Sequence, residues 1–284
     1  MREVIVAKSA GFCFGVREAL ETVYKEIEKK NGPVFTYGPI IHNEIVLDDL
    51  AKKGVRILNS EEDLEKVTDG TVIIRSHGVG EKIYDICCRK RLKVVDATCP
   101  FVARIHRIVR EKSRDGYRVI IIGDPHHPEV EGICGWGDEK TTAVESVEDF
   151  ISCGPAKNEK ICIAAQTTYN LTKFTEIVDK IRKLGYDIVC CNTICNATQE
   201  RQKEAGSIAS RVDCMIVIGS RTSSNTGKLV EICKEGCGNT IFIQTLNDLD
   251  PEALKAAGSI GITAGASTPK QLIEEVQVNV GREF

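Results

Sequence analysis

Short apolar runs alternate with amphipathic segments along the whole chain. The run at 3–8 is followed by a helical pattern that a turn at 31–33 ends. Further apolar runs lie at 34–37, 71–74, 118–122, 161–164, 214–218 and 260–263. This alternation is typical of α/β folds, because two parallel strands need a crossover connection that is usually a helix. The sequence therefore predicts an α/β protein with mostly parallel sheets.

Polar loops follow most of these runs, whereas the opposite loops are ordinary charged turns. His, Ser, Thr, Asn and Glu are concentrated at 38–43, 75–78, 123–129, 165–168, 219–226 and 264–269. Ligands of open α/β sheets bind beyond the carboxyl ends of the strands, where such loops lie. We therefore expect these loops to form the ligand-binding face of each sheet.

Three cysteines lie where an apolar run gives way to a helical pattern. They are Cys13, Cys99 and Cys195, and the intervals of 86 and 96 residues between them each match one small α/β lobe. Pro100 disfavours a helical conformation of Cys99 and suits the first position of the next helix. A thiol at such a junction is easily deprotonated. If three lobes direct their strand ends inward, the three thiols meet in one polar cavity.

Length and composition favour several lobes in a reducing compartment. The chain has 284 residues and 42% hydrophobic content, which suffices for more than one core. Its 38 basic and 41 acidic residues give a net charge of −3 without a basic block, so nucleic acid is not expected as a partner. The 13 cysteines are odd in number and the N-terminus lacks a secretion-signal pattern, which favours a cytoplasmic protein. No apolar run approaches the ~18 residues that a membrane helix needs.

Most other cysteines have structural interpretations. Buried apolar positions are expected for Cys134, Cys153, Cys162, Cys214, Cys233 and Cys237. The adjacent pairs Cys87-Cys88 and Cys190-Cys191 make poor chelates because their side chains diverge. Part of a zinc site could come from Cys191 with Cys195 or from Cys233 with Cys237. The paired C-x-x-C motifs of structural zinc are missing, however.

Two further features look functional but have simpler explanations. His106 lies in the helical pattern after Pro100 and is expected at the surface or between lobes rather than at a ligand. The loop at 219–228 resembles a phosphate loop in following a strand. It lacks a glycine five residues before Gly227, and Leu229 replaces the hydroxyl that would bind magnesium.

Widely spaced thiols among polar loops fit iron–sulfur chemistry better than zinc. Soft thiolates select iron–sulfur clusters, and a four-iron cluster with three protein thiolates leaves one iron open for a substrate. A sensor or electron relay is an alternative, although such proteins usually supply a fourth cysteine. A second alternative is a zinc hydrolase that uses the segment 126–129. The two adjacent histidines of this segment, however, cannot form the i, i+4 histidine pair of zincins.

Eight motifs together resemble the 4-hydroxy-3-methylbut-2-enyl diphosphate reductase family. They are GFCFGV at 11–16, RSHG at 75–78, DATCP at 96–100, HPEVEG at 127–132, QTT at 166–168, CNTIC at 191–195, SSN at 223–225 and AGAS at 264–267. The resemblance covers essentially the whole chain. It implies a trefoil of three pseudo-symmetric α/β lobes around a central iron–sulfur cluster, with boundaries at 14–98, 99–193, and 194–284 together with 1–13.

The resemblance also implies a reaction and a cofactor. The reaction is the reductive dehydroxylation of (E)-4-hydroxy-3-methylbut-2-enyl diphosphate to isopentenyl and dimethylallyl diphosphate, the last step of the methylerythritol phosphate route to isoprenoids. Cys13, Cys99 and Cys195 would hold a 4Fe-4S cluster whose open iron binds the substrate alcohol. No flavin or nicotinamide fingerprint occurs in the sequence, so electrons are expected from a ferredoxin or flavodoxin-type partner.

Individual side chains receive roles from the same resemblance. Glu129 would supply the proton for the leaving oxygen, with Thr167 and His127 beside it. Burial near an anionic substrate should raise the pKa of Glu129 and keep it protonated. The substrate would be bound by His42, His77, His127, Thr167, Ser223, Ser224, Asn225 and Ser267. The role of His126 is left open.

Overall fold

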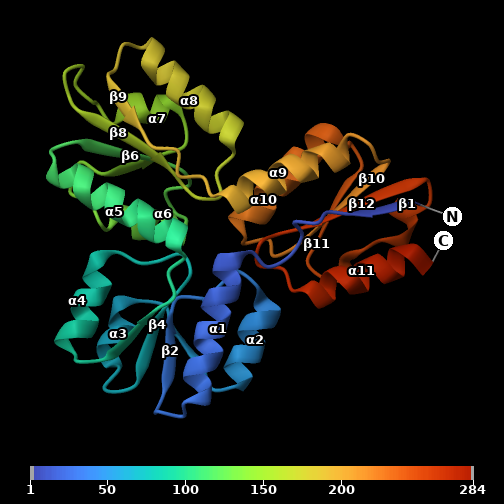
Figure 1. Cartoon of the computed structure of the whole chain (residues 1–284), viewed down its shortest axis with the longest axis horizontal. Helices are drawn as coiled ribbons and strands as arrows, with labels where there is room; N and C mark the ends of the chain where they lie inside the picture. The colour runs from blue at the N-terminus through green and yellow to red at the C-terminus, as the bar shows by residue number, and fades with distance from the viewer. Residues whose placement is uncertain (1–2, 283–284) are drawn as a thin grey trace. The chain divides into compact units, whose positions relative to one another are not determined.

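The structure is a computed structural model that describes residues 3–282, and its strands form three four-stranded parallel sheets (Figure 1). The first sheet has the strands β2 (Val34–Tyr37), β3 (Arg56–Leu58), β4 (Thr71–Ile74) and β5 (Lys93–Asp96), in the order β3-β2-β4-β5. Its helices are α1 (Phe14–Glu28), α2 (Glu44–Lys52), α3 (Glu61–Lys66) and α4 (Glu81–Arg89). All residues of β4 are buried, because β4 lies between β2 and β5 in the interior of the sheet.

The second sheet is covered by helices on both faces. Its strands are β6 (Arg118–Ile122), β7 (Thr142–Val144), β8 (Ile161–Ala165) and β9 (Ile188–Cys190), in the order β7-β6-β8-β9. Its helices are α5 (Pro100–Arg114), α6 (Pro128–Cys134), α7 (Val147–Ser152) and α8 (Leu171–Lys183). Ile120 and Ile122 pack with α7 and α8, whereas Ile121 packs with α5 and α6. Since side chains alternate along a strand, the continuous apolar run of β6 buries both faces, as expected of a parallel strand.

The third sheet combines the two ends of the chain. Its strands are β1 (Glu3–Val6), β10 (Cys214–Ile218), β11 (Thr240–Ile243) and β12 (Ser259–Ala264), in the order β11-β10-β12-β1. Its helices are α9 (Asn196–Ala209), α10 (Ser224–Gly236) and α11 (Lys270–Arg282), with short 3-10 turns η1 (Leu246–Asp248) and η2 (Pro251–Leu254). Val4 pairs with Ile260, so the N-terminal strand completes a sheet whose other strands all begin after residue 213. Helices α9 and α10 cover one face of this sheet, and α11 covers the other.

All three sheets share one topology. If the strands of each sheet are counted along the chain, and β1 is counted as the fourth strand of the third sheet, each sheet has the order 2-1-3-4. The predicted α/β fold with three similar lobes and parallel sheets is confirmed. The unpredicted strands are β3, β7 and β11, and each occupies the same edge position in its own sheet.

The lobes are grouped into two compact units. The C-terminal unit contains the third sheet and comprises residues 3–16, 42–44 and 195–282, and the central unit contains the other two sheets and comprises residues 17–41 and 45–194. The lobe boundaries at 14–98, 99–193, and 194–284 with 1–13 stay a prediction, and residues 1–2 and 283–284 lie outside the described residues.

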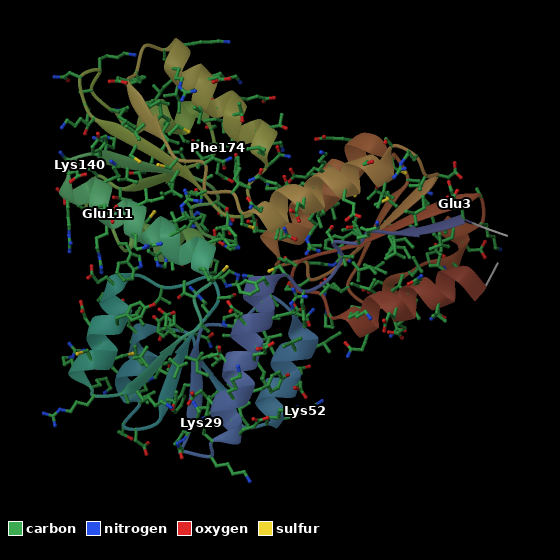
Figure 2. All side chains as sticks on the ribbon, viewed as in Figure 1. Glu3, Lys29, Lys52, Glu111, Lys140 and Phe174 are labelled. Carbon is green, nitrogen blue, oxygen red and sulfur yellow. The ribbon has the colours of Figure 1, made fainter. Side chains whose placement is uncertain are left out.

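Polar side chains lie mainly at the surface, and apolar side chains lie mainly in the cores. Glu111 and Lys140 are exposed and Phe174 is buried, as can be followed in Figure 2. All thirteen cysteines are free. Cys162, Cys214, Cys233 and Cys237 are buried as predicted, whereas Cys134 and Cys153 are only partly buried because they lie at the C-terminal ends of α6 and α7. No helix within residues 3–282 has the length and apolar character to cross a membrane.

Candidate functional site

The predicted site residues occupy equivalent positions in the three lobes. The first strand of each sheet is followed by His42, by His127 with Glu129, and by Ser223, Ser224 and Asn225. The third strand is followed by His77, Thr167 and Ser267. The fourth strand is followed by Cys99, Cys195 and Cys13. Each lobe therefore presents the same three strand ends, with one thiol and two sets of polar groups.

Each of the three cysteines immediately precedes a helix. Cys13 stands before α1, and Cys99 and Cys195 are the N-caps of α5 and α9. The Cys195 sulfur accepts a hydrogen bond from the Thr198 amide at 3.4 Å and lies 3.0 Å from the Thr198 hydroxyl. Helix N-termini offer free N–H groups and partial positive charge, which stabilise a thiolate. The predicted strand-to-helix placement of these thiols is confirmed, and their role as ligands stays a prediction.

The C-terminal unit brings together four of the predicted substrate-binding residues. Ser223 is the N-cap of α10, and its hydroxyl accepts a hydrogen bond from the Thr226 amide at 3.3 Å. The side-chain carbonyl of buried Asn225 accepts a hydrogen bond from the Ala266 amide at 3.0 Å. The Ser267 hydroxyl donates to the carbonyl of His42 at 2.9 Å. These bonds tie the turn after β12 to the start of α10 and to the His42 segment.

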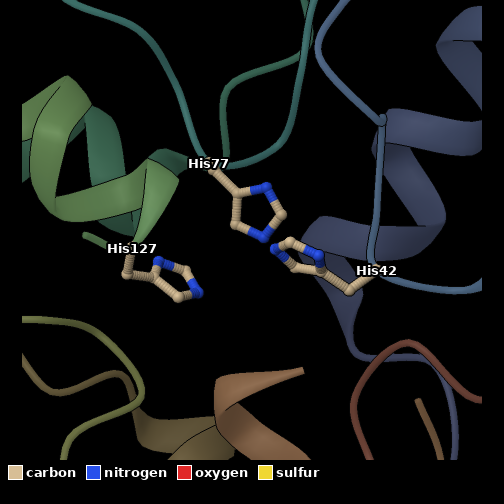
Figure 3. A group of neighbouring side chains, drawn as sticks. All are labelled: His42, His77 and His127. Atoms are coloured by element: carbon tan, nitrogen blue, oxygen red, sulfur yellow. The ribbon is translucent and has the colours of Figure 1, made fainter. Parts of the chain in front are cut away.

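A second group of predicted residues lies in the central unit, on the loop after β4. The Ser76 carbonyl accepts a hydrogen bond from the Cys99 amide at 3.0 Å, and the Ser76 hydroxyl donates to the Ile40 carbonyl at 2.9 Å. The next residue is His77, whose ring meets that of His127 edge to face, with centroids 5.6 Å apart and planes at 78° (Figure 3). His42, also labelled in Figure 3, belongs to the C-terminal unit. The loop after β4 therefore connects the Cys99 segment to the histidine-bearing start of α6.

Glu129 is a buried carboxyl group held by one residue. It has 3% of its surface exposed, its Oε1 accepts a hydrogen bond from the Thr167 amide at 2.7 Å, and its Oε2 is 2.8 Å from the donating Thr167 hydroxyl. Burial raises the pKa of Glu129 above its ordinary value, and the two bonds from Thr167 oppose that rise. Glu129 lies in the first turn of α6 rather than in a loop, because Pro128 starts the helix. The sequence-based pairing of Glu129 with Thr167 is thus matched by direct contact.

His127 caps the helix that carries Glu129. Its Nδ1 accepts a hydrogen bond from the Glu129 amide at 3.1 Å. A nitrogen that accepts a hydrogen bond carries no proton, so the ring proton of His127 lies on Nε2. His126, whose role the sequence left open, is exposed next to this cap.

Close backbone contacts fix α6 against the loop after β4. A Cβ built on Gly135 would lie 2.7 Å from the Gly80 Cα, and one built on Gly132 would lie 3.3 Å from the Gly78 carbonyl. The Trp136 indole donates to the Val79 carbonyl at 2.8 Å. Since side chains would force these two segments apart, glycine permits the approach. The same contacts hold His77 in a fixed place relative to Glu129.

His106 supports this contact from α5. It is buried, its ring stacks on Trp136 with centroids 5.2 Å apart, and a Cβ on Gly78 would lie 2.4 Å from its ring. Burial lowers the pKa of His106 to about 4. The predicted structural role between lobes is confirmed, and the alternative position at the surface is wrong because Trp136 covers the ring.

Three polar residues near the site received no individual role from the sequence patterns, although one of them, Arg75, lies in the RSHG motif. Arg75 donates to the Pro128 carbonyl at 3.4 Å, and burial lowers its pKa. Arg201 and Glu204, both on α9, bind the segment that leads to Cys13. No spacing rule singles out Arg201 and Glu204, because helices carry many arginines and glutamates on exposed faces.

The chain is similar to known proteins over almost its full length. A family model described as LytB protein matches residues 4–280. The chain is 46% identical over 276 residues to the 4-hydroxy-3-methylbut-2-enyl diphosphate reductase of Thermoanaerobacter pseudethanolicus, covering 96% of this chain and 95% of the relative. It is 43% identical over 271 residues to the protein of that name from Clostridioides difficile, covering 95% and 96%.

Two solved structures are also similar. One is the E-1-hydroxy-2-methyl-but-2-enyl-4-diphosphate reductase of Plasmodium falciparum, with a TM-score of 0.94, 31% identity, and coverage of 100% of this chain and 89% of that chain. The other is an (E)-4-hydroxy-3-methyl-but-2-enyl diphosphate reductase, described as the terminal enzyme of the non-mevalonate pathway. Its TM-score is 0.71, with 39% identity and 99% coverage of both chains.

Proposed function

The chain belongs to the LytB protein family, and from this premise we propose that it reduces (E)-4-hydroxy-3-methylbut-2-enyl diphosphate to isopentenyl and dimethylallyl diphosphate. The family and the enzyme class expected from the sequence, a reductase of the non-mevalonate route, are confirmed by these relatives. The observation that carries the detailed proposal is the repeated placement of one cysteine after the fourth strand of each lobe.

The proposed cofactor is a 4Fe-4S cluster held by Cys13, Cys99 and Cys195. Two observations support the fit: the donors are soft thiols, and each thiol stands at the N-terminus of a helix of at least 14 residues, α9 being the shortest. When bound, such a cluster supplies single electrons and a Lewis-acidic iron. A ferredoxin or flavodoxin-type protein is the proposed electron donor, and the cytoplasm is the proposed location.

Glu129 is the proposed source of the proton that the departing hydroxyl needs. Burial raises the pKa of this carboxyl group, which favours the protonated form that a general acid must have. The Thr167 amide can only donate, so Oε1 of Glu129 accepts in either protonation state. The proton is therefore proposed on Oε2, which in the protonated carboxyl group donates to Thr167 Oγ1, the reverse of the bond made by the ionised carboxylate. From there it passes to Thr167 Oγ1 while the Thr167 hydroxyl proton moves to the leaving oxygen.

The proposed diphosphate site uses neutral donors instead of lysines. In the C-terminal unit these are the N-terminus of α10, a helix of 13 residues, with Ser223, Ser224, Asn225 and Ser267. A helix N-terminus suits an anion because its free N–H groups and dipole favour negative charge. His42, His77 and His127 complete the proposed set, and His127 contributes the proton on its Nε2.

Metal analysis of one anaerobic preparation tests the proposal. We expect iron and sulfide in near-equal amounts without zinc, and reductase activity with the allylic diphosphate when a chemical reductant is supplied. Serine at Cys13, Cys99 or Cys195 should remove the cluster absorbance. Cys88→Ser is the matched control, because Cys88 is exposed on α4 and should retain it.

The same preparation separates the alternatives. Zinc without iron would support a hydrolase and refute the reductase. A complete cluster in a protein that does not convert the diphosphate would support a sensor or an electron relay. Full absorbance in all three cysteine variants would refute the ligand assignment.

A further inference from the structure

Arg201 is a buried cation that links α9 to the segments around it. It has 3% of its surface exposed, and it lies in the second turn of the helix that Cys195 caps. One terminal nitrogen donates to the Ala264 carbonyl at 2.7 Å and the other donates to the Gly11 carbonyl at 2.9 Å. Ala264 ends β12, and Gly11 stands two residues before Cys13. One guanidinium group therefore joins the helix of Cys195 to the segment of Cys13.

Other bonds hold the same segment. Glu204, one turn after Arg201, accepts hydrogen bonds from the Lys8 and Ser9 amides, both at 2.8 Å. The Cys13 amide donates to the Ala266 carbonyl at 3.1 Å. Residues 8–13 are thus fixed by α9 and by the turn after β12. Cys13 and Cys195 are held as a pair within the C-terminal unit.

The charge of Arg201 is incompletely balanced by its hydrogen-bond partners. Both of its hydrogen bonds go to neutral carbonyls, and its Nε has no hydrogen-bond partner among residues 3–282. Burial lowers the pKa of Arg201, whereas the negative charges of Cys13, Cys195 and Glu204 oppose that change. Arginine stays protonated in proteins, so the group remains a fixed cation. A buried charge requires compensation, which the thiolates of Cys13 and Cys195 would provide in the proposed cluster site.

We propose that Arg201 is a positioning residue that holds the Cys13 segment against α9. Its fixed positive charge then lies beside two of the cluster's thiolate ligands, and this charge raises the reduction potential of the cluster. The inference rests on the proposed cluster site. A nearby cation stabilises the reduced cluster more than the oxidised cluster, because the reduced form carries one more negative charge. Loss of the charge therefore makes the cluster harder to reduce.

Two substitutions separate charge from geometry. Arg201→Met removes the charge and both hydrogen bonds but keeps an unbranched apolar side chain. Arg201→Lys keeps the charge but loses the fork that reaches two carbonyls. Lys203→Met is the matched control, because it removes one positive charge from the same helix at an exposed position.

The first measurement is the midpoint potential of the reconstituted cluster by spectroelectrochemistry. At a fixed potential, Arg201→Met should lower the ratio of reduced to oxidised cluster at least about tenfold, which for a one-electron couple is about 59 mV. Arg201→Lys should retain most of the wild-type potential, and Lys203→Met should retain all of it. An unchanged potential in Arg201→Met would overturn the electrostatic part of the inference.

The second measurement is amide hydrogen exchange in protein without a cluster. The amides of Lys8, Ser9 and Cys13 should exchange at least about tenfold faster in both Arg201 variants, and at the wild-type rate in Lys203→Met. Unchanged exchange in both Arg201 variants would overturn the positioning role. If Arg201→Met does not fold, Arg201→Lys still tests this role. Wild-type protein that takes up no cluster would refute the proposed function, and the exchange rates would still test the placement of Cys13.

Discussion

Gly135 ends α6 against the backbone of Gly80, and Gly135→Ala tests whether this contact positions Glu129. The new methyl would lie 2.7 Å from the Gly80 Cα. Carbon atoms pack at about 3.5–4.0 Å, so the two segments would have to separate by about 1 Å. The backbone of Gly135 is already in a right-handed conformation, so steric contact is the only new cost.

The expected loss of stability follows from this overlap. Overpacking of this kind typically costs about 1–3 kcal/mol. For a chain of this size each kcal/mol lowers the thermal midpoint by about 2–4 °C, so Gly135→Ala should unfold roughly 2–12 °C below the wild type. Differential scanning calorimetry of the cluster-free protein measures this directly. Turnover should fall by up to about 100-fold, because a displacement of about 1 Å misplaces the catalytic group.

Gly238→Ala is the matched control. Gly238 is exposed, and a Cβ there meets no atom within 4 Å. This variant should keep both the midpoint and the turnover of the wild type. If Gly135→Ala behaves like Gly238→Ala in both assays, the glycine contact does not position the helix that carries Glu129, and the reasoning is refuted.

Two pH-dependent predictions concern buried titratable groups. Because burial raises the native pKa of Glu129, the native state keeps a proton that the unfolded state loses near pH 4.5, so stability falls as the pH rises from there through the native pKa. Glu129→Gln should remove this pH dependence of stability, as measured by urea unfolding. The same variant should lower turnover about 10²–10⁴-fold with the cluster intact. Wild-type turnover in this variant would mean that Thr167 or water, and not Glu129, supplies the proton. His106 behaves in the opposite sense, because its pKa is about 4 in the native state and 6.5 in the unfolded chain. Lowering the pH from 6.5 to about 4 should therefore lower the free energy of unfolding by roughly 3 kcal/mol, at about 1.4 kcal/mol per pH unit. His106→Phe should lose this dependence, as followed by the fluorescence of the single tryptophan, Trp136, and equal pH profiles for variant and wild type would contradict the assignment.

Sequence patterns predicted the interior strands and the edge strands β1, β5 and β9, but not the edge strands β3, β7 and β11. The interior strands β4, β6, β8, β10 and β12 bury nearly all their residues and read as continuous apolar runs. The missed strands are β3, β7 and β11, which have three or four residues each and only one buried residue apiece. These short strands are half solvated, so their composition resembles that of a loop, whereas an apolar run before each of the three cysteines marks the edge strands β1, β5 and β9. The pairing partner, which the local sequence does not contain, decides the structure of β3, β7 and β11.

Sequence patterns likewise predicted some features of the candidate site and not others. The positions of the cysteines and of the polar loops could be predicted because strand ends, proline and turn residues mark them, whereas the roles of Glu129 and of the hydroxyl residues came from the family resemblance and stay proposals. The supporting contacts could not be predicted, since the Gly135 contact with Gly80 and the bond from Arg201 to Gly11 join residues 55 and 190 positions apart. Such contacts depend on how helices lie across a sheet, which periodicity alone does not specify.

The pairing of β1 with β12 has a consequence for how the protein is made. Residues 3–6 leave the ribosome long before their partners at 259–262 are synthesised. Cys13 can reach its native place only after β12 has been released, so the proposed cluster must be loaded after β12 is synthesised. A chain truncated before β12 would leave the N-terminal strand without its partner and would present only two of the three thiols in native positions. Cluster insertion is therefore coupled to the synthesis of β12.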